Sequence, residues 1–134
     1  MYKYGDITRY IIGVAMKVHQ ELGPGFQEHI YHRAMEIALP KVSFEVESEK
    51  EFDVSFQNEW VGTFRVDLFI NKVVIVELKA VCGEMPKLFY TQTISYLKAS
   101  GVEVGLILNF GNRELEFKRV ARYPDFASDA INQS

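Results

Sequence analysis

The sequence lacks several features that would place it outside the cytoplasm. It has one cysteine, Cys82, among 134 residues, which excludes an internal disulfide or a zinc site built from several cysteines, and fits a reducing compartment. The longest apolar run near the start covers only residues 11–16, whereas a membrane-spanning helix needs about 20 residues. The start of the chain also lacks the basic segment and long apolar stretch of a secretory signal. We therefore expect a cytoplasmic protein without membrane association.

Neither sign of charge dominates the chain. Its 15 Lys and Arg residues stand against 18 Asp and Glu residues, for a formal net charge of −3. This balance argues against binding to nucleic acid through overall charge alone, and leaves room for a local basic groove. The composition, 48% hydrophobic and 25% charged, is that of a folded chain with one hydrophobic core. We predict a single domain over residues 1–134, with a core of about 6–120 and a polar tail at 121–134.

Hydrophobic periodicity predicts an α/β domain. Helices are expected over residues 6–22, 26–39 and 86–100, with His19 on the outer side of the first helix. Strands are expected over residues 43–49, 51–56, 60–70, 73–79, 104–110 and 114–120. This order indicates a mixed sheet flanked by helices. Residues 73–76 are apolar at consecutive positions, which is typical of a central strand with both faces covered.

Charged residues gather at the end of that central strand. Alternate residues of a strand share a face, so Glu77 and Lys79 are expected to point together. If Asp67 on the preceding strand faces the same side, two carboxylates converge, and a divalent cation such as Mg²⁺ or Mn²⁺ would relieve their repulsion. A water held by that ion could attack a phosphodiester, with Lys79 orienting the water or stabilising the developing charge.

This arrangement demands one strand register. Asp67 lies opposite Glu77 only if Ile70 lies opposite Val74, which leaves a three-residue loop at 71–73. A regular two-residue hairpin turn would send Glu77 to the other face of the sheet. We therefore predict a loop of odd length or a bulge between these strands.

A purely structural interpretation of the same residues is also available. Glu77 and Lys79 would then be a solvated strand end, and Asp67 a member of a surface ion pair. The apolar run before Glu77 argues instead for burial, where charges need partners or a bound ion.

Two helical motifs extend the pattern and give it a family resemblance. The helical motifs are Gly25-x-x-Glu28-x-x-Tyr31 and Gln92-x-x-x-Tyr96, and they lie on either side of Asp67 … Glu77-Leu78-Lys79 in the chain. In this order and spacing the chain resembles, from about residue 6 to residue 120, the GxxExxY proteins, a bacterial branch of the PD-(D/E)XK nuclease superfamily. The resemblance implies a restriction-endonuclease-like core, with a mixed four-stranded central sheet and helices on both faces. Val66 stands where the superfamily's name has proline.

The resemblance also implies roles for individual residues. Asp67 and Glu77 would bind Mg²⁺ or Mn²⁺ with the backbone carbonyl of Leu78 as a third ligand, and Lys79 would be the catalytic lysine. Glu28 would approach the metal directly or through a water, and Gln92 would orient the site or contact a phosphate. The implied function is hydrolysis of phosphodiester bonds, in DNA more than in RNA, by one small domain or a homodimer. The alternative is a catalytically silent module of the same fold that binds nucleic acid or a protein partner.

Overall fold

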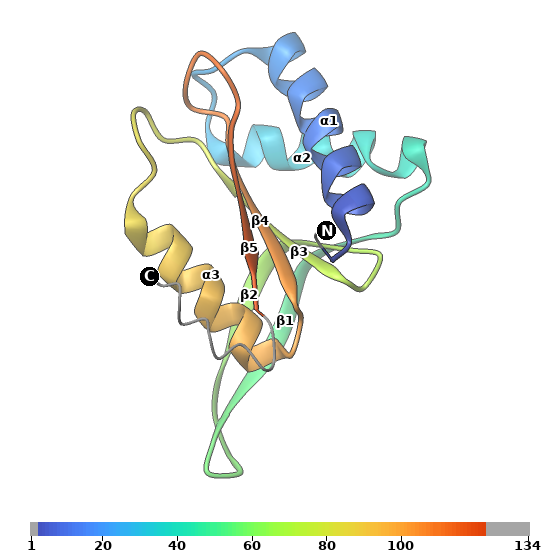
Figure 1. Ribbon diagram of the computed structural model, residues 1–134. Coiled ribbons are helices and arrows are strands. Elements are labelled where there is room, and N and C mark those ends of the chain that lie inside the picture. The colour runs from blue at the N-terminus through green and yellow to red at the C-terminus, as the bar shows by residue number, and fades with distance from the viewer. Residues whose placement is uncertain (1–2, 123–134) are drawn as a thin grey trace.

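The computed structural model describes residues 3–122, so the predicted tail beyond Arg122 lies outside the described residues. Helices and strands form one α/β arrangement, with two α-helices preceding the strands and a third between the third and fourth strands (Figure 1). The elements in chain order are α1 (Gly5–Leu22), α2 (Glu28–Ala38), a short 3₁₀ helix η1 (Pro40–Val42), β1 (Val46–Phe56), β2 (Glu59–Ile70), β3 (Val74–Lys79), α3 (Lys87–Ser100), β4 (Val104–Asn109) and β5 (Glu116–Ala121). No helix among residues 3–122 is both long and apolar enough to cross a membrane.

The five strands form one mixed sheet in the order β1-β2-β3-β4-β5. All neighbours are antiparallel except β3 and β4, which are parallel and are joined through α3. Figure 1 shows α3 on one side of the sheet and α1 with α2 on the other. The predicted mixed sheet with helices on both faces is therefore confirmed, with five strands rather than the four implied by the resemblance.

Strand β3 lies between two hydrophobic clusters, one on each face of the sheet. Val74, Val76 and Leu78 pack with α1 and α2, whereas Ile75 packs on the other face with α3. Side chains on both faces of the strand are buried, as predicted from its consecutive apolar residues. Its polar end, Glu77, is consequently held inside the fold.

The separate strands predicted at 43–49 and 51–56 are one continuous strand, β1. Its polar centre contains no glycine or proline, and pairing with the 12-residue β2 continues on both sides of it. The pairing skips Glu49, whose φ of 56° is positive, and shifts register between Val54 and Ser55. Strand β1 starts at Val46, later than predicted, and Ser43 after η1 has a positive φ of 71° that does not belong to a strand.

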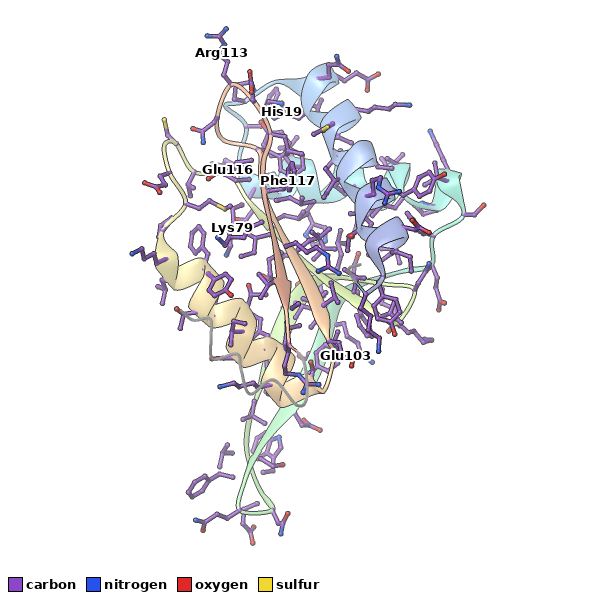
Figure 2. All side chains as sticks on the ribbon, viewed as in Figure 1. His19, Lys79, Glu103, Arg113, Glu116 and Phe117 are labelled. Carbon is purple, nitrogen blue, oxygen red and sulfur yellow. The ribbon has the colours of Figure 1, made fainter. Side chains whose placement is uncertain are left out.

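The outward placement predicted for His19 is wrong. Its side chain is buried, and Nε2 lies 2.8 Å from the backbone oxygen of Asn112. The ring also lies 6.1 Å from that of Phe110. Figure 2 shows His19 beside the β4–β5 loop that carries Arg113. This loop covers the last turn of α1, a long-range contact that helical periodicity does not reveal.

Candidate active site

The strand register required for the site is present. Ile70 lies opposite Val74, and the loop between β2 and β3 has three residues, as predicted. Asn71 and Lys72 of this loop have φ values of 52° and 58°. The last backbone pair at the other end joins Leu68 to Val76, so Asp67 and Glu77 are the first residues beyond the ladder. The two carboxylates therefore lie at the fork where β2 and β3 separate.

At this fork the carboxylates occupy positions that backbone carbonyls fill in a regular ladder. The backbone N–H of Leu78 donates a 2.7 Å hydrogen bond to Oδ2 of Asp67, and the backbone N–H of Asp67 donates a 3.2 Å bond to Oε2 of Glu77. The N–H and C=O of one strand residue point toward the same neighbouring strand. The carbonyl of Leu78 therefore faces the fork as well, beside the two carboxylates.

A break in strand alternation accompanies the fork. Val66 and Phe69 pack in the same hydrophobic cluster although they are three residues apart, which a regular strand does not allow. Glu49, with its positive φ, lies across from Asp67 between the regular pairs of β1 and β2. Valine serves at position 66 as a fully buried core residue, so the local geometry forms without proline.

Glu77 is held in an environment that disfavours its charge. Its side chain is 6% exposed, so the interpretation as a solvated strand end is wrong. Burial, together with the negative charge of Asp67, raises the pKa of the Glu77 carboxyl to about 8, against the lowering effects of the Asp67 N–H and of Lys79. The pKa of Asp67 is also raised, chiefly by burial, despite the hydrogen bond from Leu78.

Lys79 does not neutralise the carboxylates by direct contact. Its Nζ lies 4.3 Å from the ring centroid of Phe89 on α3, and Figure 2 shows the side chain between the sheet and that helix. Within residues 3–122 it makes no ion pair. Its positive charge still lowers the pKa values of Asp67 and Glu77, so it lies within electrostatic range of both.

Glu28, at the start of α2, lies within electrostatic range of Asp67 and Lys79. Partial burial has the largest effect and raises the pKa of Glu28. The charge of Asp67 raises this pKa further, and the charge of Lys79 lowers it. The position of the helix start is fixed by Tyr31, whose hydroxyl donates to the carbonyl of Gly23 at 2.5 Å and accepts from the N–H of Phe26 at 3.2 Å. The hydroxyl of Tyr31 thus fixes the conformation of the loop that precedes Glu28.

The polar face of α3 is only partly joined to the site. Tyr96 stacks on Phe64 at 4.3 Å, and its pKa is raised by burial and then by the charges of Glu77 and Asp67. Gln92, one turn earlier, is exposed and makes no hydrogen bond to these carboxylates in the described part of the chain. Of the predicted residues, Gln92 is the one that the structure leaves apart.

Sequence reasoning gave no role to Asn109, which organises the segment after Lys79. This fully buried side chain accepts from the N–H groups of Val81 and Gly111, and donates to the carbonyl of Val81 and to Glu116. Gly111 lies so close that an added Cβ would be 2.3 Å from the carbonyl oxygen of Val81. A polar residue ending an apolar strand next to the strand of Lys79 is the signal that could have indicated this role.

The site's donor set fits a hard divalent cation. Two carboxylates and the Leu78 carbonyl, completed by water, are the oxygen ligands that Mg²⁺ and Mn²⁺ take in proteins. Within residues 3–122 no three His, Cys, Asp or Glu side chains gather as a metal cluster, so the two carboxylates are not joined by a third such side chain there. A site of this kind needs the carbonyl and water to complete it.

The family follows from comparison with known proteins. A family model of the PD-(D/E)XK nuclease superfamily matches residues 5–120. The chain belongs to this superfamily. No curated protein matches the sequence.

Two solved structures are similar to this superfamily member. The crystal structure of SSO0001 has a TM-score of 0.58 and 19% identity over 79% of this chain, which spans 58% of that protein's length. An alkaline exonuclease from Laribacter hongkongensis has a TM-score of 0.45 and 13% identity, with coverage of 99% of this chain and 78% of that one. At such identity the likeness to SSO0001 concerns the fold alone.

Proposed function

We propose that this protein is a metal-dependent nuclease of the GxxExxY branch that hydrolyses phosphodiester bonds, with DNA preferred over RNA. The observation that supports the proposal is the fork between β2 and β3, where Asp67 and Glu77 converge beside a lysine that has no ion-pair partner among residues 3–122. Glu77 is buried and Asp67 half-buried, both have raised pKa values, and their ionised forms are costly to the fold unless a cation is bound. The exposed thiol of Cys82 fits a cytoplasmic setting.

Asp67, Glu77 and the Leu78 carbonyl would hold Mg²⁺ or Mn²⁺. When bound, the cation supplies a water of lowered pKa and neutralises charge on the phosphate. Glu77 has to release its proton for this, since its pKa is about 8 in the free protein. Lys79 extends along the face of Phe89 with an ammonium free to donate to the attacking water or to a phosphate oxygen.

Glu28 and Gln92 complete the proposed site from the two sides. Glu28 is exposed at the first turn of α2, where its carboxylate can hold a water at the edge of the site and take up a proton. Gln92 is exposed on α3, where its amide can contact a phosphate.

The silent-module alternative makes a different demand on Lys79. In a fold that has lost its chemistry, this ammonium would be expected between the two carboxylates, in place of an ion. It rests on Phe89 instead, which favours the enzyme. The protein would act as one small domain or as a homodimer, and light scattering of the purified protein would distinguish these two states.

The proposal is tested by calorimetric titration of Mn²⁺ together with cleavage of labelled DNA and RNA. We expect Asp67→Ala to lose both metal binding and cleavage, and Lys79→Ala to lose cleavage with metal binding intact. Lys98→Ala, which removes an exposed lysine at the far end of α3, is the matched control. Cleavage by Lys79→Ala at the wild-type rate, or equal Mn²⁺ binding by wild type and Asp67→Ala, would contradict the assignment.

A further inference from the structure

A groove of about 690 Å³ opens between the start of α3 and β5, and it adjoins the proposed active site. Phe89 and Ile107 both line this groove. Phe89 carries the ammonium of Lys79 on its ring, and Ile107 lies directly opposite Glu77 in the β3–β4 ladder. The groove is therefore continuous with the fork on the α3 face of the sheet.

Lys118 places a positive charge in this groove in line with the metal site. It pairs with Ile107 across β4 and β5, and Ile107 pairs with Glu77. Residues that lie opposite one another in a sheet share a face, so Lys118 and Glu77 are on the same side, two strand spacings or roughly 10 Å apart. The Nζ of Lys118 lies 5.2 Å from the ring centroid of Tyr90, which stands on the opposite wall of the groove.

We propose that the groove holds a single-stranded polynucleotide next to the phosphate that is cleaved. Lys118 binds a neighbouring phosphate, and the ring of Tyr90 stacks on a base. Lys87, at the start of α3, adds a second cation at the groove wall. Positive side chains alternating with aromatic rings are the features by which proteins hold single strands. The inference rests on the proposed nuclease function and extends it to the form of the substrate.

A single strand fits this groove better than a duplex does. Tyr90 is 40% exposed, and Lys118 lies over one face of its ring, so a base would stack on the other face. In a duplex the flat face of each base is already covered by its stacked neighbours. Two carboxylates, of Glu84 and Glu116, also line the groove. Glu116 is tied by hydrogen bonds from Asn109 and Asn112, at 3.0 Å and 3.4 Å.

A larger groove on the protein does not adjoin the proposed active site. It measures about 1080 Å³ and is lined by Tyr10, Val14 and Val18 of α1, on the side of the sheet away from Lys79.

The test is the fluorescence anisotropy of a labelled 12-nucleotide oligo-dT and of a duplex of equal length, in EDTA so that no cleavage occurs. We expect the single strand to bind at least tenfold more tightly than the duplex. Lys118→Ala and Tyr90→Ala should each weaken single-strand binding roughly five- to tenfold, whereas Lys98→Ala should change it less than twofold. Oligo-rU in place of oligo-dT distinguishes RNA from DNA as the strand that is held.

Salt dependence separates phosphate contact from a general loss of structure. Lys118→Ala should lower the slope of log Kd against log salt by about 0.7, the value for one phosphate contact on a single strand. Tyr90→Ala should leave that slope unchanged, and Tyr90→Phe should retain wild-type affinity. Tighter binding of the duplex, or equal losses in Lys118→Ala and Lys98→Ala, would overturn the proposal.

The two proposals fail in different ways. If the wild type cleaves DNA with metal but the groove variants bind and cleave like wild type, the groove assignment is wrong and the nuclease stands. If the groove variants lose binding while no divalent metal supports cleavage, the nuclease function is wrong and the groove stands as a binding site.

Discussion

The backbone N–H of Asp67 donates a hydrogen bond to the carboxylate of Glu77, so two acidic residues, one half-buried and one buried, are joined directly. This bond and its counterpart from Leu78 hold two carboxyl groups at the point where two strands part. Hydrogen bonds to the ionised forms offset part of the cost of burial, and the rest appears as raised pKa values. The fold thus keeps an arrangement that is unfavourable without a ligand.

We predict that Glu77→Gln stabilises the metal-free protein above neutral pH. The pKa of Glu77 is raised from 4.5 to about 8 on folding, so the folded state binds the proton more tightly, and wild-type stability falls as pH rises from about 4.5 to 8. The loss is at most about 5 kcal/mol. Glutamine lacks this titration, so urea unfolding in EDTA at pH 6 and pH 9 should show a smaller pH dependence for the variant.

Glu84→Gln, which removes an exposed carboxyl from the loop before α3, serves as its control. It should follow the wild-type pH dependence, part of which comes from Asp67. Equal pH dependence in wild type and Glu77→Gln would show that Glu77 does not carry the raised pKa.

We also predict that metal affinity depends steeply on pH. Metal binding requires the ionised form of Glu77, which is the minor form below pH 8. The apparent association constant for Mn²⁺ should therefore rise about tenfold per pH unit between pH 6 and pH 7.5 and level off above pH 8. Calorimetry in buffers of different ionisation enthalpy should detect about one proton released per ion at pH 7; a constant affinity over this range would refute the assignment.

Tyr31→Phe should lower the stability of the protein and disturb the position of Glu28. The variant retains the ring that stacks on Phe110 at 4.6 Å but loses the hydroxyl that joins Gly23 to Phe26. Leaving these backbone groups without their partner should cost about 1–3 kcal/mol in urea unfolding.

Tyr10→Phe removes a hydroxyl from an exposed tyrosine and should leave stability within about 0.5 kcal/mol of wild type. If Glu28 acts in the reaction, Tyr31→Phe should also lower kcat at saturating Mg²⁺ while Tyr10→Phe does not. A wild-type kcat in Tyr31→Phe would show that the Tyr31 hydroxyl does not contribute to the reaction through Glu28.

Asn109→Ala should be among the most damaging substitutions outside the carboxylates. It removes four hydrogen bonds from a fully buried position and leaves the N–H of Val81 without this partner. We expect a loss of about 2–4 kcal/mol in the free energy of unfolding. Asn112→Ala, which removes bonds from a less buried side chain to Gly83, should lose less; the reverse order would contradict this ranking.

The fold and the register of the site could be predicted because both follow from short-range rules. The apolar run before Glu77 required a central strand, and the demand that Asp67 share its face fixed a three-residue loop, which is present. Other features depend on contacts between distant segments. His19 is buried by a loop some 90 residues away, and Asn109 acts on a segment 28 residues earlier in the chain. Periodicity within one element carries no information about such contacts.

Gly111 has a consequence for how this sequence can vary. A Cβ at this position would lie 2.3 Å from the carbonyl oxygen of Val81, so any side chain would push the β4–β5 loop away from the segment that follows Lys79. In a library of all single substitutions, position 111 should therefore be as intolerant as Asp67, for a steric rather than a chemical reason. A tolerance map of this protein will mark both positions alike, and metal titration of purified variants will distinguish a missing ligand from a displaced loop.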